Sequence, residues 1–247
     1  MPVDRNLWRR AIRKAGSPRW PCPGCPTGTL KLRRETLVFH ETTGSLPTDE
    51  EGNFDPYGII YAFSALLECE NCRVKIACSG EGGEEIFDWQ DEEGSWNYNH
   101  EPALYPRYFS RPMPILRLKF SVPENVKDRL LKSFLLIFAD SGAAANYARQ
   151  CSEEILSDRG VPKMTKNGGY MSLETRIKKF EGSDSANANR ISALRWIGNF
   201  GSHSGPVKFN DVLNAYDILE ILLEDLYFGH YRSTQLLIDR INRERRP

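Results

Sequence analysis

Hydrophobic and polar residues alternate along several short stretches in the N-terminal half of the chain. The period is two, and β-branched or aromatic residues are frequent, which is typical of strands. These stretches are residues 28–40, 59–67, 73–78 and 85–89. Residues 41–57 are rich in Gly, Pro, Asp and Thr and therefore predict a protruding loop between the first two strands. The pattern predicts a small antiparallel sheet.

Residues 91–115 carry many aromatic residues and prolines without a clear alternation. This composition predicts an extended connector that packs one structural unit onto the next.

From Ser121 onward, apolar residues recur every three or four positions, which predicts helices. Ser121-Val-Pro-Glu124 has the form of a capping box with a proline near the helix start. Asn210 is expected to cap a long helix near the C-terminus. The expected helices begin after Ser121 and continue over residues 143–156, 173–180, 191–197, 210–226 and 231–243.

The two patterns together predict an α+β protein. The expected β part spans residues 1–112, and an antiparallel helical bundle is expected over residues 113–247. We see no internal repeat in the sequence.

Two cysteine pairs, Cys22-Pro-Gly-Cys25 and Cys69-Glu-Asn-Cys72, lie in the predicted turns of the β part. Each pair places two thiolates two residues apart, and four such sulfurs suit a tetrahedral, structural Zn²⁺. The 43 residues between the pairs exceed the usual spacing of about 15–20. The predicted loop accounts for most of this excess, so we expect a zinc ribbon. The alternative is four unligated cysteines.

The remaining cysteines, Cys78 and Cys151, fall on a strand pattern and a helix pattern. We interpret both as small buried residues rather than ligands.

The composition favours a soluble protein of 247 residues. The mean hydropathy is −0.50, and no apolar run approaches the ~20 residues that a membrane helix needs. The N-terminus lacks the apolar segment of a secretory signal, so a cytoplasmic location is expected. In that reducing compartment the cysteine pairs would bind metal rather than form disulfides.

The net charge is zero, but the charges are unevenly distributed. Residues 1–34 contain nine Lys or Arg against one acidic residue, Asp4, whereas residues 35–101 are strongly acidic. One interpretation is a set of solvated faces that pair with the acidic middle. The other is a basic rim that contacts nucleic-acid phosphates.

Three motifs of the helical half occur in order: Phe138-Ala-Asp-Ser-Gly-Ala-Ala-Ala-Asn-Tyr-Ala-Arg149, Gly160-Val-Pro162 and Leu194-Arg-Trp-Ile-Gly-Asn-Phe-Gly-Ser-His203. With them, residues 105–229 resemble the bacterial family called domain of unknown function 4145. The resemblance implies a HEPN-like helical bundle, commonly preceded by a cysteine-rich ribbon. It also implies a setting beside restriction and other anti-phage systems.

Catalytic HEPN ribonucleases carry an Arg followed by Asn or His and then a His, which move a proton and stabilise charge on phosphate. By resemblance, Asn199 and His203 hold the Asn and His positions. Gly198 stands where the Arg is expected. Arg195 is one helical turn before Asn199, shares its face and would partly replace that Arg. The alternative for Asn199 and His203 is a helix cap and polar network.

A second polar group is predicted on the helix that contains Arg149. Small residues around Arg149 permit close helix contact, and Glu153 or Glu154 follows one turn on. Asn146 and Arg149 are expected to converge with Asn199 and His203 between helices. An ion pair that stabilises the bundle is one interpretation, and a nucleotide or phosphate pocket is the other.

The sequence therefore predicts a zinc-binding, non-enzymatic module of a bacterial anti-phage defence or mobile-element system. Its expected partners are nucleic acid (RNA or DNA), a defence-system protein, and a second copy in a homodimer, with no membrane. The alternative is a metal-independent ribonuclease around His203, with Asn199 and Arg195. A further alternative is a structural subunit that docks through the aromatic residues of 96–109.

Overall fold

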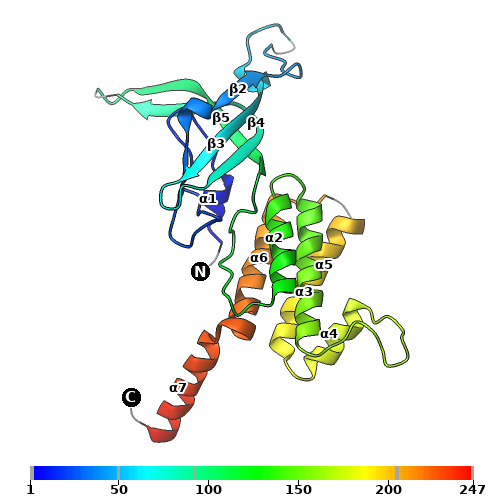
Figure 1. Ribbon diagram of the computed structural model, residues 1–247. Coiled ribbons are helices and arrows are strands. Elements are labelled where there is room, and N and C mark those ends of the chain that lie inside the picture. Colours follow the sequence, from blue (N-terminus) through cyan, green and yellow to red (C-terminus); the bar gives the residue numbers. More distant parts are fainter. Residues whose placement is uncertain (1–2, 49–50, 92, 204–205, 246–247) are drawn as a thin grey trace. The chain divides into compact units, whose positions relative to one another are not determined.

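The structure is a computed structural model that describes residues 3–48, 51–91, 93–203 and 206–245 (Figure 1). The chain divides into two compact units. The first is Asp4–Met113, and the second begins at Pro114 and includes Val3. The first contains an antiparallel sheet and the second is helical, which confirms the predicted α+β class. None of the described helices combines the length and hydrophobicity required of a membrane span.

The first unit is built on a single antiparallel sheet in the strand order β1-β3-β4-β5, with β2 also paired to β3. A short helix, α1 (Arg5–Arg9), precedes the sheet. The strands are β1 (Leu30–Leu32), β2 (Val38–Glu41), β3 (Ile60–Cys69), β4 (Lys75–Gln90) and β5 (Trp96–Phe109). Residues 42–48 and 51–59, between β2 and β3, belong to the predicted loop, which contains a 3₁₀ turn at Pro56–Gly58.

Two expectations for this sheet were wrong. Most of the predicted connector is strand β5, which pairs with β4 along its whole length. Its prolines conceal it in the sequence but are compatible with an edge strand, where a missing N–H is tolerated. The predicted strands 73–78 and 85–89 are two ends of the single strand β4. Glycines interrupt its pattern, and Gly82 is required there because a Cβ would collide with the Ala103 carbonyl oxygen and lie 2.9 Å from Leu104 Cα.

The core of the first unit lies on one face of the sheet. Trp20 is buried there and its ring meets Phe109 edge-on, with 5.5 Å between centroids. Its indole N–H donates to the Leu7 carbonyl over 3.2 Å. Phe63, Ala65, Leu67, Ile76, Cys78 and Leu104 complete this buried face. The N-terminal segment therefore covers the sheet rather than extending from it.

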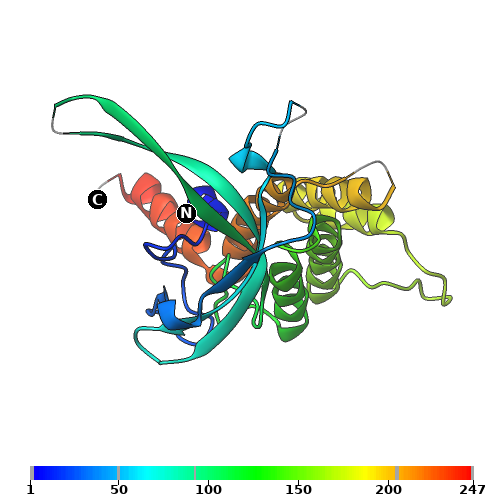
Figure 2. The same ribbon diagram turned by 90° about the horizontal axis from the view of Figure 1, so that it is seen from above.

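Strands β4 and β5 continue past the rest of the sheet as a two-stranded arm. β3 ends its pairing at Ile60↔Gly83, whereas β4 and β5 remain paired as far as Gln90↔Trp96. Figures 1 and 2 show this arm projecting from the sheet. It carries exposed Trp96 and Tyr98 beside several carboxylates.

The second unit is a helical bundle in which α3 packs against α2, α5 and α6. Its helices are α2 (Glu124–Leu136), α3 (Ser141–Asp158), α4 (Leu173–Glu181), α5 (Ser185–His203), α6 (Phe209–Leu223), the π-helical turn η3 (Glu224–Phe228) and α7 (His230–Glu244). Buried apolar residues follow the predicted helical period, for example Val126, Leu130 and Phe134 in α2.

The predicted caps of two helices were wrong. α2 is preceded by Pro123, which cannot cap it with a side chain, instead of by the predicted Ser121. α6 begins after Lys208 rather than at Asn210, and the Asp211 carboxylate accepts from the Lys208 N–H over 2.9 Å.

Two buried polar contacts fix the bundle. Tyr216 Oη lies 2.8 Å from Ser133 Oγ, which donates to the Ala144 carbonyl in the next helix. Burial raises the pKa of Tyr216, so the phenol stays neutral. Arg176 is buried, and its Nη2 donates to the carbonyls of Glu153 and Val161, which ties α4 to the end of α3.

Candidate functional site

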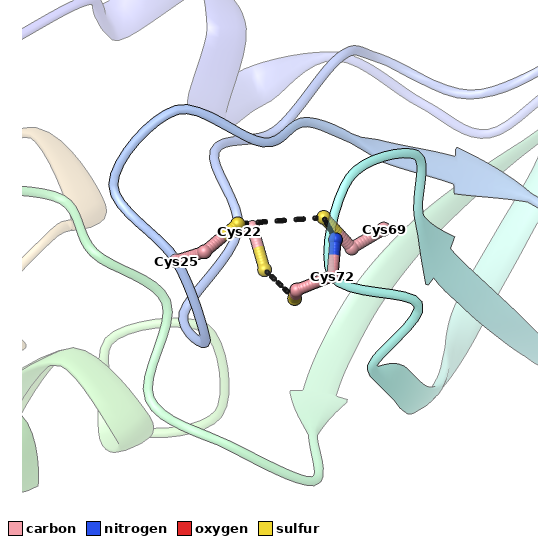
Figure 3. A group of neighbouring side chains, drawn as sticks. All are labelled: Cys22, Cys25, Cys69 and Cys72. Carbon is pink, nitrogen blue, oxygen red and sulfur yellow. Dashed lines mark hydrogen bonds between the residues drawn. The ribbon is translucent and has the colours of Figure 1, made fainter.

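The four cysteines predicted as ligands lie together in the first unit, although two segments of the chain supply them. Cys22 and Cys25 belong to the turn before β1, Cys69 ends β3, and Cys72 lies in the turn before β4. Their sulfurs all lie within 4.8 Å of one another (Figure 3).

The spacing of the sulfurs suits a tetrahedral metal. Cys22 Sγ is 3.6 Å from Cys72 Sγ, and Cys25 Sγ is 3.7 Å from Cys69 Sγ. A metal–sulfur bond of about 2.3 Å gives a tetrahedron with an edge of about 3.8 Å. The distances and the all-sulfur donor set therefore fit a closed metal site.

Backbone N–H groups point at these sulfurs. Gly24 N donates to Cys22 Sγ over 3.2 Å, and Asn71 N and Cys72 N donate to Cys69 Sγ over 3.3 and 3.4 Å. Burial opposes ionisation of Cys69, but the N–H donors of Cys72 and Asn71, together with the thiols of Cys22 and Cys72, outweigh it and lower the pKa of this thiol to about 6. Burial raises the pKa of the Cys22 thiol. A bound cation would ionise both, because a coordinating thiol is deprotonated.

Two glycines beside the cluster differ in how much space surrounds them. A Cβ on Gly28 would lie 2.7 Å from Cys25 Sγ and closer still to Cys69 Sγ. A Cβ on Gly24 would lie 3.2 Å from Val74 Cγ1 and 3.4 Å from Cys72 Sγ. Gly28 is thus a residue of the site that the cysteine spacing did not reveal.

We expect Gly28→Ala to weaken metal binding by about tenfold to a hundredfold, the range seen when the support of a metal ligand is lost. The added methyl would push the Cys25 and Cys69 sulfurs apart. Competition with a chromophoric zinc chelator measures this affinity. Gly24→Ala is the matched control and should bind metal nearly as well as the natural chain. Equal affinity in both variants would show that the two sulfurs can move freely.

A buried carboxylate lies next to the cluster on β3. Glu68 pairs with Arg33 and with Arg73, the latter over 2.7 Å. The Arg33 hydrogen bond outweighs burial and holds the pKa of Glu68 below its usual range. Arg73 has a left-handed backbone, with φ of 62°, which is costly for a residue other than glycine. These residues line a cavity of about 540 Å³ beside Cys69, with acidic and basic groups in near balance.

A second cavity of about 540 Å³ is lined by the N-terminal segment, including Arg9, Arg10 and Arg13, and by Tyr105 of β5. Arg13 is held by Glu85 and Glu101 over 2.5 and 2.6 Å. Arg9 and Arg10 are exposed, and within the described part of the chain they form no ion pair. No carboxylate lines this cavity. We call it the Arg9–Arg10 groove.

In the helical unit, two of the predicted polar residues meet. Arg149 Nη1 donates to Glu153 over 2.6 Å, and its Nη2 donates to Asn146 Oδ1 over 3.1 Å. Both partners of the ion pair are largely buried. Gly198 of α5 lies directly against Arg149, because a Cβ there would be 2.6 Å from Arg149 Cβ. Arg149 therefore forms an ion pair with Glu153, as one of the two interpretations of this residue expects.

Of the predicted ribonuclease motif, the structure describes the side chains of Arg195 and Asn199. Arg195 donates to Glu174 of α4 over 3.0 Å, and its guanidinium lies 4.6 Å from the centre of the Trp196 ring. Asn199 is half-buried on α5. The α5 helix continues to His203, so Gly198 lies inside the helix rather than in the predicted helix ending. The side chain of His203 lies outside the described residues.

Two family models match the chain, one within each of the two compact units. Residues 10–109 match the model of a domain of unknown function (DUF8608), and residues 132–244 match that of a domain of unknown function (DUF4145). The second match supports the resemblance of the helical half to that family. No curated protein and no solved structure matches the chain.

Proposed function

We propose that this chain is a zinc-binding, non-enzymatic module that binds nucleic acid, as part of a bacterial anti-phage defence or mobile-element system. The Arg9–Arg10 groove is the observation that carries the proposal. The match of residues 132–244 to DUF4145 supports the biological setting through the family resemblance.

Zinc is the metal that the donor set favours. Four thiolates form a soft tetrahedral set, which suits Zn²⁺ better than Mg²⁺ or Ca²⁺. Cys22, Cys25, Cys69 and Cys72 would hold it. With four protein ligands the ion has no open position for a substrate, so its role is to join the turn before β1 to the end of β3. As in a zinc ribbon, the metal would hold two cysteine-bearing turns together, here at one end of a five-stranded sheet.

The charge of the groove favours a polyanion. Several arginines of the first unit are neutralised by carboxylates, such as Arg13, Arg19 and Arg33. Arg9 and Arg10 are not, and each guanidinium can donate two parallel hydrogen bonds to a phosphate. Two unpaired arginines beside an exposed tyrosine are the pattern of a surface that follows a nucleic-acid backbone.

We expect the double variant Arg9→Ala/Arg10→Ala to bind a labelled oligonucleotide less tightly and with a weaker dependence on salt. Each lost phosphate contact removes about 0.7–0.9 from the slope of log K against log salt, so the slope should fall by about 1.5. Fluorescence anisotropy at several salt concentrations measures both. Lys166→Ala, an exposed change in the helical unit, is the control.

Two other outcomes decide against the proposal. If the natural chain binds no DNA or RNA at low salt, the nucleic-acid function is wrong and a protein partner replaces it. If the RNA probe is cleaved in EDTA, and His203→Ala abolishes cleavage in a folded chain, the chain is a metal-independent ribonuclease instead.

A further inference from the structure

A β-bulge places two tyrosines of β5 on the same face of the sheet. Residues three apart in a regular strand point to opposite faces. Here Tyr105 pairs with Glu81 and Tyr108 pairs with Ser79, so that Arg107 is an extra residue. Because Ser79 and Glu81 share a face of β4, their two partners also share it.

Gly80 makes this bulge possible. A Cβ at Gly80 would lie 2.8 Å from Arg107 N and closer still to the Tyr105 carbonyl oxygen. Any larger residue would push β5 away from β4 at the bulge. The irregularity is therefore encoded in the sequence, and its effect is to align the two rings.

The surroundings of the two rings are open and flat. Tyr105 is 38% exposed and Tyr108 is 51% exposed. Ser64 and Ala62 of β3 occupy the same face, opposite Ser79 and Glu81, and both are exposed and small. The other face of the sheet holds the buried core. The sheet surface is therefore open around Tyr108 and at the exposed edge of the Tyr105 ring, where planar groups can stack, whereas Ala103 beyond Tyr105 on the same face is buried.

Tyr105 also lies beside positive charge. Tyr105 lines the Arg9–Arg10 groove, and its hydroxyl donates to Glu85, which fixes the direction of the ring. Arg13 forms ion pairs with both Glu85 and Glu101, the carboxylates next along this face, and so balances one of their two negative charges. Phosphates in the groove would therefore place the attached bases near Tyr105.

We propose that the ligand is single-stranded nucleic acid, whose bases stack on Tyr105 and Tyr108 while Arg9 and Arg10 hold its phosphates. This inference rests on the proposed function and narrows it. In a duplex the base faces are already stacked and unavailable, whereas unpaired bases stack readily on aromatic side chains. Stacking accepts every base, so we expect little sequence preference.

The test compares labelled 12-mers of oligo(dT) and oligo(U) with a duplex of the same length, measured by anisotropy on the full chain with zinc bound. Tyr105→Ala and Tyr108→Ala should each weaken single-strand binding about tenfold, within the range for loss of one stacked base. Tyr105→Phe and Tyr108→Phe retain the ring and should bind normally. Tyr98→Ala, at an exposed tyrosine on the opposite face of the arm, is the matched control.

The salt dependence separates this inference from the proposed function. Loss of a stacked base should lower affinity without changing the salt slope, unlike loss of Arg9 and Arg10. If the duplex binds as tightly as the single strands, or if the tyrosine variants bind normally, the inference is wrong. The proposed binding of nucleic acid in the Arg9–Arg10 groove is unaffected by either result. Absence of all binding would overturn both. Tighter binding of both oligo(dT) and oligo(U) than of the duplex would support the inference.

Discussion

Removing the metal from the four-cysteine site is expected to unfold the first unit while the helical unit stays folded. Structural Zn²⁺ contributes about 10 kcal/mol or more to small zinc domains at neutral pH, which is comparable to the whole stability of a domain, about 5–15 kcal/mol. Cys69→Ser should have the same effect as a chelator, because Cys69 is buried and closes the cluster from β3. Acid should act likewise, since protons compete with the metal for thiolates.

Two measurements can monitor the unfolding of the first unit. Near-ultraviolet circular dichroism reports Trp20, which packs on Phe109, and limited proteolysis shows which unit is cut. Cys78→Ala is the matched control, because Cys78 is buried in the same sheet but lies outside the cluster. It should keep about one zinc per chain. If the first unit is as resistant to protease after chelation as before it, the metal has no structural role.

Gly198→Leu is expected to destabilise the helical unit strongly. The new side chain would collide with Arg149 and with the Ala145 carbonyl, which lies 3.2 Å from a Cβ at this position. Overpacking of this kind costs about 3 kcal/mol, which corresponds to a melting temperature lower by roughly 10 °C. Differential scanning calorimetry measures the shift. Gly198→Ala should show a smaller loss, because alanine favours the helix.

Gly182→Ala provides the comparison for this experiment. The nearest atom to its added methyl is the Lys179 carbonyl at 3.9 Å, so the melting temperature should be unchanged. An unchanged melting temperature for Gly198→Leu would show instead that α3 and α5 separate at little cost.

The same collision also bears on the ribonuclease hypothesis. An arginine at position 198, where the family resemblance leads us to expect one, would have no room while Arg149 occupies that space.

The sequence predicted the parts of the fold that depend on short-range spacing. Cysteine pairs two residues apart identified the metal cluster, because such a turn directs both sulfurs to one point. The apolar period of three to four identified the helices. Strand β5 was missed, since aromatic residues and prolines hide the alternation of an edge strand.

The parts that depend on long-range assembly could not be predicted. Arg13 is neutralised by Glu85 and Glu101, far along the chain, so the sequence did not show which arginines remain unpaired. The same holds for Gly28 and Gly198, whose importance lies in atoms brought close by folding. The interpretation of Arg149 as an ion-pair partner needed only the helical period, and Glu153 does pair with it.

The separation of the two cysteine pairs sets an order of events during synthesis. Cys22 and Cys25 leave the ribosome before Cys69, with 43 residues between Cys25 and Cys69, and the last ligand is Cys72. Until then the first pair offers only half of a coordination shell and must remain reduced. The sheet core also waits for β5, because domains fold as units once their chain is available. Metal capture therefore becomes possible once Cys72 has emerged, closure of the sheet follows when β5 is available, and a shortage of zinc would act on newly made chains first.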